Sequence, residues 1–244
     1  SGPVMVSIYT SYNYILRFLT EIASRVELSS VYSFGNVFAK KEDKKVYSLF
    51  KEYMMMFILI AFSMCLTFMI GIRGFITVWV GKENYILDYL TVVLFTSTSF
   101  LNILYFPLVA LINADGLFKD NKRHIFICAL TNLVLSLLLI GKYGINGILI
   151  GTSVAFIVNI MLKSNLISKK IMKKVSLIRI LKYYIVSILL FIFVSSCSIG
   201  TIIFFKLLIT SCALLDFSNN IILDNNVSFP NNYLLSIFCL ISLA

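Results

Sequence analysis

Three charged residues, Arg17, Glu21 and Arg25, recur at intervals of four positions within an otherwise apolar stretch. Because an α-helix repeats every 3.6 residues, this spacing places all three on one helix face, close to the face that carries Asn13. Charged groups inside a membrane span are costly and almost always face the protein interior or a water-filled cavity. The polar stripe therefore predicts a functional site.

Two interpretations of this stripe compete. An Arg-carboxylate-Arg ladder can be a self-neutralising structural pair, but two cations against one anion leave a net positive charge. Guanidinium groups also bind phosphate in a bidentate manner. The sharper hypothesis is that Arg17, Arg25, Glu21 and Asn13 line a cationic, substrate-binding cavity for a phosphorylated ligand. In that hypothesis Glu21 holds the arginines apart or exchanges a proton.

Other polar and small residues fall inside predicted spans. Asn132 and Asn159 lie in two neighbouring spans, where an amide usually bonds across helices but is also a candidate ligand for an ion. Gly144, Gly147 and Gly151 have a spacing that allows close approach of two helices, so we expect a packing role for them.

The sequence carries no motif for ATP hydrolysis or zinc chemistry, and its five cysteines are scattered singly through apolar stretches. We therefore expect a protein that is not an enzyme, with no catalytic residue, no metal and no cofactor.

The composition predicts an all-α, polytopic membrane protein. Of 244 residues, 59% are hydrophobic and 13% are charged, which lies outside the usual range of soluble domains. Charge-free windows of about 20 residues match the thickness of a bilayer core. Together with the alternation of the basic connections, they predict about seven transmembrane helices, the first of which carries the charged stripe. These lie near residues 11–39, 53–79, 89–113, 124–141, 146–162, 183–205 and, cut off by the end of the sequence, 233–244.

The basic residues set the expected topology. The net charge of +10 is concentrated between spans, with fifteen Lys and Arg in alternate connections and three in the others. This alternation follows the positive-inside rule for a multi-pass protein and gives no reason to expect nucleic acid as a partner. Residues 163–182 are predicted to be a basic cytoplasmic linker or an amphipathic helix on the anionic leaflet. Residues 206–232 are an outer loop or an interfacial helix.

Three stretches carry a resemblance to a known family. The first is the run Val6 to Asn13 with the run Ser33 to Lys40 after it, and the second is Pro107 with the loop Ala114 to Asp120. The third is the run Thr131 to Leu139 followed by Tyr143 to Ile148. In their order and spacing they resemble the carboxy-terminal half of the bacterial polysaccharide (O-antigen) flippases, in the multidrug/oligosaccharidyl-lipid/polysaccharide exporter superfamily.

The resemblance implies a two-lobe transporter of which this chain is the second lobe. It implies that residues 1–162 are helices of that lobe and residues 183–244 additional carboxy-terminal helices, with an amino-terminal lobe as partner. It further implies a flippase in the bacterial cytoplasmic membrane that moves undecaprenyl-diphosphate-linked oligosaccharide for O-antigen or capsule biosynthesis. Alternating access would be driven by Na⁺ or H⁺. The chain opens without an initiator Met, and we expect it to be part of a larger protein.

Two alternatives stay open. A multidrug or metabolite exporter of the same superfamily would need an acidic cavity for cationic drugs, whereas the stripe here is net basic. A membrane-embedded glycan polymerase or ligase would typically carry its reactive side chains on a large outer loop, and the predicted outer loops are short or rich in Asn.

Overall fold

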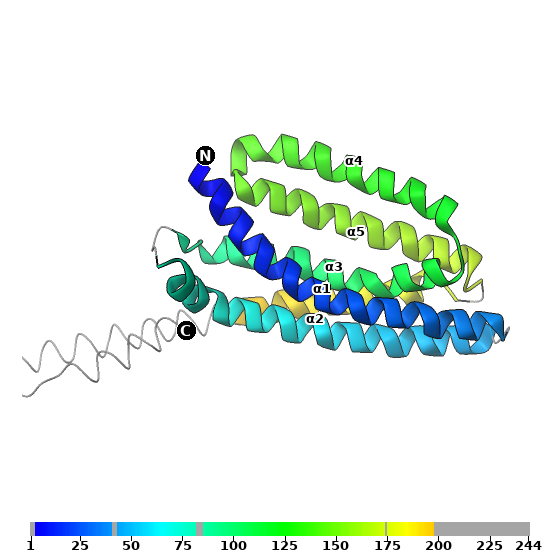
Figure 1. The fold of residues 1–244 in the computed structure, drawn as a ribbon. Coiled ribbons are helices and arrows are strands. Elements are labelled where there is room, and N and C mark those ends of the chain that lie inside the picture. Colours follow the sequence, from blue (N-terminus) through cyan, green and yellow to red (C-terminus); the bar gives the residue numbers. More distant parts are fainter. Residues whose placement is uncertain (1–2, 41–42, 82–84, 174, 198–244) are drawn as a thin grey trace, which may run out of the picture. The chain divides into compact units, whose positions relative to one another are not determined.

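The computed structural model describes residues 3–40, 43–81, 85–173 and 175–197. The described part is entirely helical (Figure 1), which confirms the predicted fold class. Its helices are α1 (Pro3–Ala39), α2 (Asp43–Val80), α3 (Tyr89–Ala114), α4 (Phe118–Tyr143), α5 (Ile145–Lys170) and a sixth helix, Leu177–Cys197. The seventh predicted helix and the segment 206–232 lie outside the described residues.

Five of these helices are long and apolar enough to cross a membrane, as expected of a multi-pass membrane protein. They are the segments Lys45–Val80, Tyr89–Ala114, Phe118–Tyr143, Ile145–Lys170 and Leu177–Cys197. Helix α1 is not among the five, although its 37 residues reach about 55 Å. The charged stripe in its middle lowers the hydropathy of every window that contains it.

The described chain divides into two compact units. The first comprises residues 1–69 and 87–187, and the second comprises residues 70–86 and 188–244. In the second unit, α2 ends at Val80 and is followed by Gly81 at φ 64°, a backbone conformation that favours glycine at a helix end. Phe75 and Trp79 pair there at 5.4 Å between ring centroids. The candidate site belongs to the first unit.

In the first unit, successive helices run in opposite directions (Figure 1). One end of this unit contains the carboxyl end of α1, the start of α2 and the connections that follow α3 and α5. The opposite end contains the turn at Gly144. Most described basic residues outside α1 gather at the first end, and Lys142 lies beside Gly144. This distribution agrees with the alternation of basic connections in the sequence, from which the positive-inside rule predicts a cytoplasmic side.

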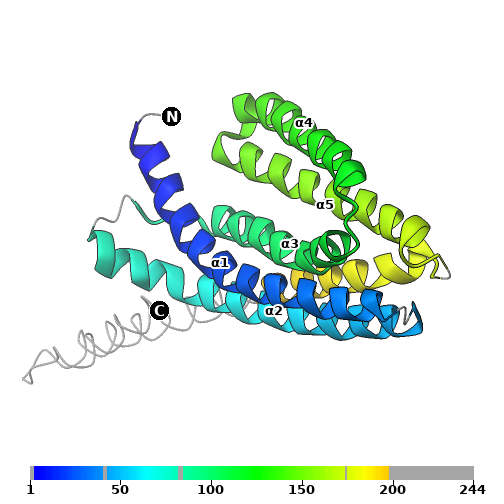
Figure 2. The same cartoon turned by 45° about the vertical axis from the view of Figure 1, so that its right-hand side comes forward.

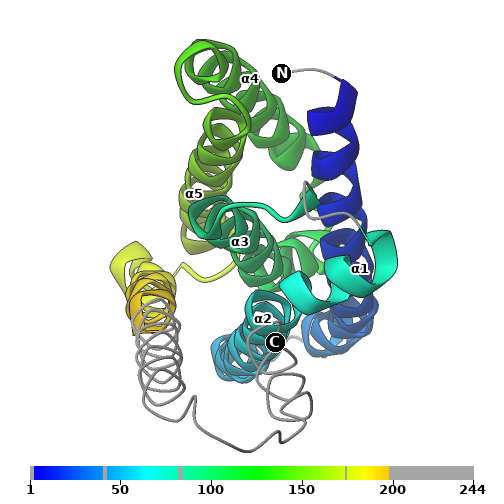
Figure 3. The same ribbon diagram turned by 90° about the vertical axis from the view of Figure 1, so that its left-hand side faces the viewer.

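Helix α3 occupies the middle of the first unit and packs on both α1 and α5, while α4 packs mainly on α5 (Figures 2 and 3). Aromatic side chains join α2 to α1 and α3, through Phe34 with Tyr53, Phe57 with Phe106 and Phe62 with Phe100. Tyr12 is fully buried, and its phenol oxygen accepts a hydrogen bond from the backbone N–H of Leu87 at 3.2 Å. These contacts fix the position of α1 against the rest of the unit.

Helices α4 and α5 form a hairpin with a single turn residue. Gly144 ends α4 and begins α5 at φ 56° and ψ −131°, a conformation that side chains with a Cβ rarely adopt. Gly147 and Gly151 then face α4, and a Cβ at Gly147 would lie 2.5 Å from the carbonyl oxygen of Leu139. The spacing of these glycines does serve packing, because it lets the two backbones touch.

The close approach predicts that Gly151→Ala destabilises the protein. Its Cβ would lie 2.7 Å from Ser136 Oγ and 2.9 Å from the backbone nitrogen of Ser136. Overpacking of this kind costs about 1–3 kcal/mol. We expect a lower Tm in detergent-solubilised full-length protein, followed by intrinsic fluorescence.

Gly141→Ala is the matched control, because a Cβ at Gly141 meets nothing within 4 Å. Alanine is favoured over glycine in a helix by about 1 kcal/mol, so the Tm of this variant should stay the same or rise slightly. Equal Tm values for both variants would contradict the close contact between α4 and α5.

Candidate functional site

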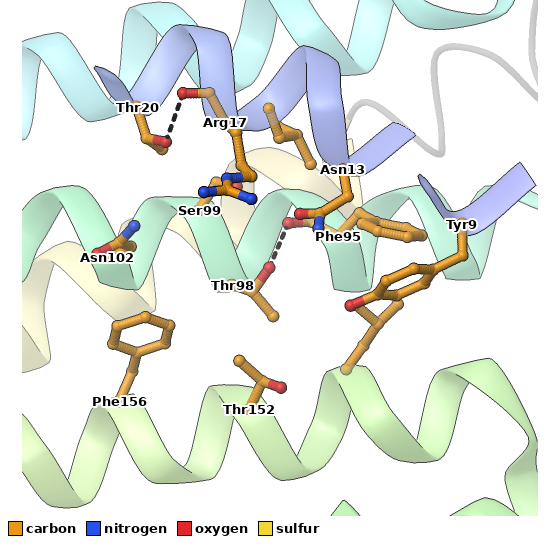
Figure 4. Close-up of a pocket in the computed structure, with 12 residues that line it drawn as sticks. Tyr9, Asn13, Arg17, Thr20, Phe95, Thr98, Ser99, Asn102, Thr152 and Phe156 are labelled. Atoms are coloured by element: carbon orange, nitrogen blue, oxygen red, sulfur yellow. Dashed lines mark hydrogen bonds between the residues drawn. The ribbon is translucent and has the colours of Figure 1, made fainter. Parts of the chain in front are cut away.

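A cavity of about 180 Å³ lies between α1, α3 and α5 (Figure 4). Its lining combines one cation with amides, hydroxyls and aromatic rings, and it contains no carboxylate. The lining residues are Tyr9, Asn13, Leu16, Arg17 and Thr20 from α1, Phe95, Thr98, Ser99 and Asn102 from α3, and Leu149, Thr152 and Phe156 from α5. Two predicted site residues, Asn13 and Arg17, are therefore brought together here.

Arg17 supplies the charge of the cavity. Its side chain extends from α1 toward α3, on the same side as Asn13 (Figure 4). No carboxylate pairs with Arg17 in the part of the chain that the structure describes. An arginine carries five N–H donors in a planar fork, so the cavity presents an uncompensated cation that can bind an oxyanion through two parallel hydrogen bonds.

Helix α3 contributes neutral polar groups opposite Arg17. The hydroxyl of Thr98 donates to the backbone carbonyl of Phe95 at 2.7 Å, so its oxygen can still accept a hydrogen bond. Ser99 and Asn102 lie beside Thr98 on the same helix and also line the cavity. Such groups can bind the hydroxyls of a polar ligand without adding charge.

Aromatic rings close two sides of the cavity. Tyr9 and Phe95 contact each other at 5.2 Å between ring centroids, and Phe156 extends from α5 on the far side (Figure 4). Flat apolar surfaces beside a cation and several hydroxyls suit a ligand that combines an anionic group with an apolar or sugar-like portion.

The structure places Glu21 and Arg25 outside this cavity. The two side chains pair with each other at 3.5 Å and are 68% and 73% exposed, respectively. They neither line the cavity nor approach Arg17 through an ion pair, so Glu21 does not separate two arginines here. For this pair the geometry matches the structural-ladder interpretation, and the cationic cavity contains one arginine rather than two.

Asn132 bonds across helices. Its side-chain oxygen accepts hydrogen bonds from Ser136 Oγ at 3.0 Å and from Thr152 Oγ1 at 3.3 Å. This amide therefore joins α4 to Thr152, one of the three α5 residues that line the cavity. Its oxygen is occupied by protein donors, which leaves it poorly placed as an ion ligand.

Asn159 is buried, and its oxygen has no hydrogen-bond partner. It belongs to a second polar site, a buried cluster separate from the Arg17 cavity, together with Tyr105 of α3 and Lys163 of α5. The expected linker from residue 163 begins later than predicted, because α5 continues to Lys170 and buries Lys163 completely. The sequence signal was present: Asn159 and Lys163 are four positions apart and share a helix face.

No protein-family model, curated protein or solved structure matches this chain. The chemistry of the cavity is therefore argued from its own residues.

Because only Arg17 lines the cavity, alanine variants of Arg17 and Arg25 should differ in their affinity for an anionic ligand. We expect Arg17→Ala to weaken binding of inorganic pyrophosphate at least tenfold, since a hydrogen bond to a charged group contributes roughly 1.5–3 kcal/mol. Arg25→Ala should leave the affinity close to the wild-type value, because Arg25 does not line the cavity. Titration calorimetry on detergent-solubilised full-length protein measures both.

Arg17→Lys should bind with intermediate affinity, since it keeps the charge and loses the planar fork. An equal loss of pyrophosphate affinity in Arg17→Ala and Arg25→Ala would instead show that Arg25 also contributes to the binding site.

Proposed function

We propose that this chain is the second lobe of a flippase that moves undecaprenyl-diphosphate-linked oligosaccharide across the bacterial cytoplasmic membrane. The observation that carries the proposal is the guanidinium of Arg17, which no carboxylate pairs, in a cavity that α1 forms with the apolar helices α3 and α5. Arg17 is solvent-exposed at this cavity and has no carboxylate partner among the described residues, so a ligand can reach it. A diphosphate is a ligand of matching charge and geometry.

The size of the cavity indicates which part of the lipid-linked substrate it holds. Pockets for drug-sized ligands usually enclose about 300–1,000 Å³, whereas this one encloses about 180 Å³. That volume suits a diphosphate with part of the first sugar rather than a whole oligosaccharide. In the proposed transporter the remaining sugars lie toward the amino-terminal lobe, and alternating access of the two lobes carries the headgroup across.

Export of drugs or metabolites, the alternative function within the same superfamily, is less favoured. A cavity for cationic drugs would need a carboxylate, and the lining of this cavity has none. The glycan polymerase or ligase is less favoured because the turn at Gly144 leaves no room for reactive side chains on a loop between α4 and α5. Transport of an anionic lipid-linked glycan therefore fits the described residues best.

Surface display of the glycan tests the proposal in cells whose chromosomal gene encodes the full-length protein. With Arg17→Ala we expect a reduction of display of about tenfold or more and accumulation of lipid-linked precursor inside the membrane, following the loss of a charge-assisted contact. Arg25→Ala, at equal abundance in the membrane, should display glycan at close to the wild-type level.

Undiminished display with Arg17→Ala would overturn the proposed role of the cavity. Loss of display without precursor accumulation would place the defect in glycan synthesis rather than in transport.

A further inference from the structure

The second buried polar cluster gathers charged and polar side chains from four helices near the basic end of the first unit. Glu27 comes from α1, Tyr105 from α3, and Lys163 and Asn159 from α5. Helix α4 contributes the nearby side chains His124 and Cys128, which interact electrostatically with Lys163. None of these residues lines the cavity of Arg17.

Lys163 is held by a single aromatic side chain. It is fully buried, and its Nζ donates to the phenol oxygen of Tyr105 at 3.2 Å. The same nitrogen lies 4.4 Å from the centroid of the Tyr105 ring, a distance at which the ring face attracts a cation. An ammonium has three N–H donors, so one phenol leaves it under-satisfied.

Glu27 is buried and also incompletely satisfied. Its side chain is 9% exposed, it interacts with the side chain of Asn113, and its Oε1 atom has no hydrogen-bond partner. Burial of an ionised carboxylate is unfavourable unless each oxygen finds a donor or a cation. Glu27 therefore lies in a place that favours proton uptake unless a cation approaches it.

Glu27 and Lys163 interact electrostatically without forming a direct ion pair within the described ranges. A buried carboxylate and a buried ammonium have two stable arrangements. They either close into contact as two ions or stay apart with the carboxylate protonated. In the structure the ammonium of Lys163 bonds Tyr105 and is not paired with Glu27. A movement of α1 against α5 that brings the two groups into contact would therefore favour the ionised pair.

The other groups facing Glu27 favour a proton over a metal cation at this place. Lys163 approaches from α5, Tyr105 from α3, and His124 and Cys128 lie on α4 beside Lys163. The ammonium of Lys163 would repel Na⁺, whereas a proton neutralises Glu27 without displacing Lys163. The unpartnered oxygens of Glu27 and Asn159 therefore do not make a sodium site.

We propose that Glu27 is a proton-binding site whose occupancy is controlled by its distance from Lys163. The carboxylate takes up one proton from the basic, cytoplasmic end to become a neutral carboxylic acid, and releases that proton when Lys163 approaches. Arg17 lies on the same helix, about 15 Å away along its axis. Movement of α1 that follows headgroup binding at Arg17 then changes the protonation of Glu27. This coupling role rests on the proposed function, whereas proton binding itself does not.

Infrared spectroscopy of the full-length protein in nanodiscs of neutral lipid tests proton binding without any ligand. The carboxyl C=O stretch of a protonated side chain is followed across pH, and we expect Glu27→Gln to remove one titrating carboxyl group. Glu52→Gln is the matched control, because Glu52 is exposed on α2 and interacts with Ser48. Its replacement should leave the Glu27 carboxyl band unchanged.

Neutralising Lys163 tests the pairing. In Lys163→Met the Glu27 carboxyl band should persist to a pH at least one unit higher, which is a tenfold change in proton concentration, because the cation that favours ionisation is gone. Lys163→Gln should shift the band in the same direction and keeps a donor for Tyr105 if the methionine variant does not fold. A band that is unchanged in Glu27→Gln, or unmoved in both Lys163 variants, would overturn the proposal.

Glycan display tests the coupling role separately. We expect Glu27→Gln to lower display at normal membrane abundance, while Glu52→Gln stays at the wild-type level. Full display with Glu27→Gln would overturn coupling even if the infrared titration succeeds. Full display with Arg17→Ala beside an intact Glu27 titration would overturn the proposed function and leave the proton site standing.

Discussion

A hydrocarbon environment offers no water to a polar group, and this constraint governs how the described helices meet. Helix α4 carries large apolar side chains outward, including Phe126, Leu130 and Leu137, as a surface against lipid requires. The polar side chains of α3 and α5 instead turn toward each other and bond in successive layers. The pairs are Thr91 with Asn146, Ser97 with Ser153, and Tyr105 with Lys163. The Arg17 cavity is lined by α3 and α5 at this interface, and the polar cluster around Glu27 shares its Tyr105–Lys163 bond.

The helices were largely predictable from hydropathy, and the differences have a physical cause. Residues 89–113 were predicted as a span, and the helix is Tyr89–Ala114, because polar residues bound the apolar run closely. Residues 124–141 were predicted where the helix is Phe118–Tyr143. Hydropathy marks the part of a helix that suits the bilayer, whereas hydrogen bonding continues the helix into the polar turns on both sides.

The candidate site was predictable only in part, because periodicity places residues on a face without saying what lies opposite. Arg17 and Arg25 are eight positions apart, which turns them about 80° from each other around the helix. That angle is enough for Arg17 to meet the cavity and for Arg25 to pair with Glu21 on an exposed surface. Lys163 was assigned to a basic linker because charge counting treats every lysine as solvated. Its burial depends on Tyr105, which is distant in the sequence and close only in the fold.

The single-residue turn at Gly144 bears on how the chain is made. With one residue between α4 and α5, neither helix can enter the bilayer and wait for the other at a distance. We therefore expect the two helices to insert together as a hairpin, packed through the glycines that face α4 and paired at the basic end by Lys170 and Asp120. The pairing of α4 with α5 then does not depend on diffusion of two separate helices in the membrane.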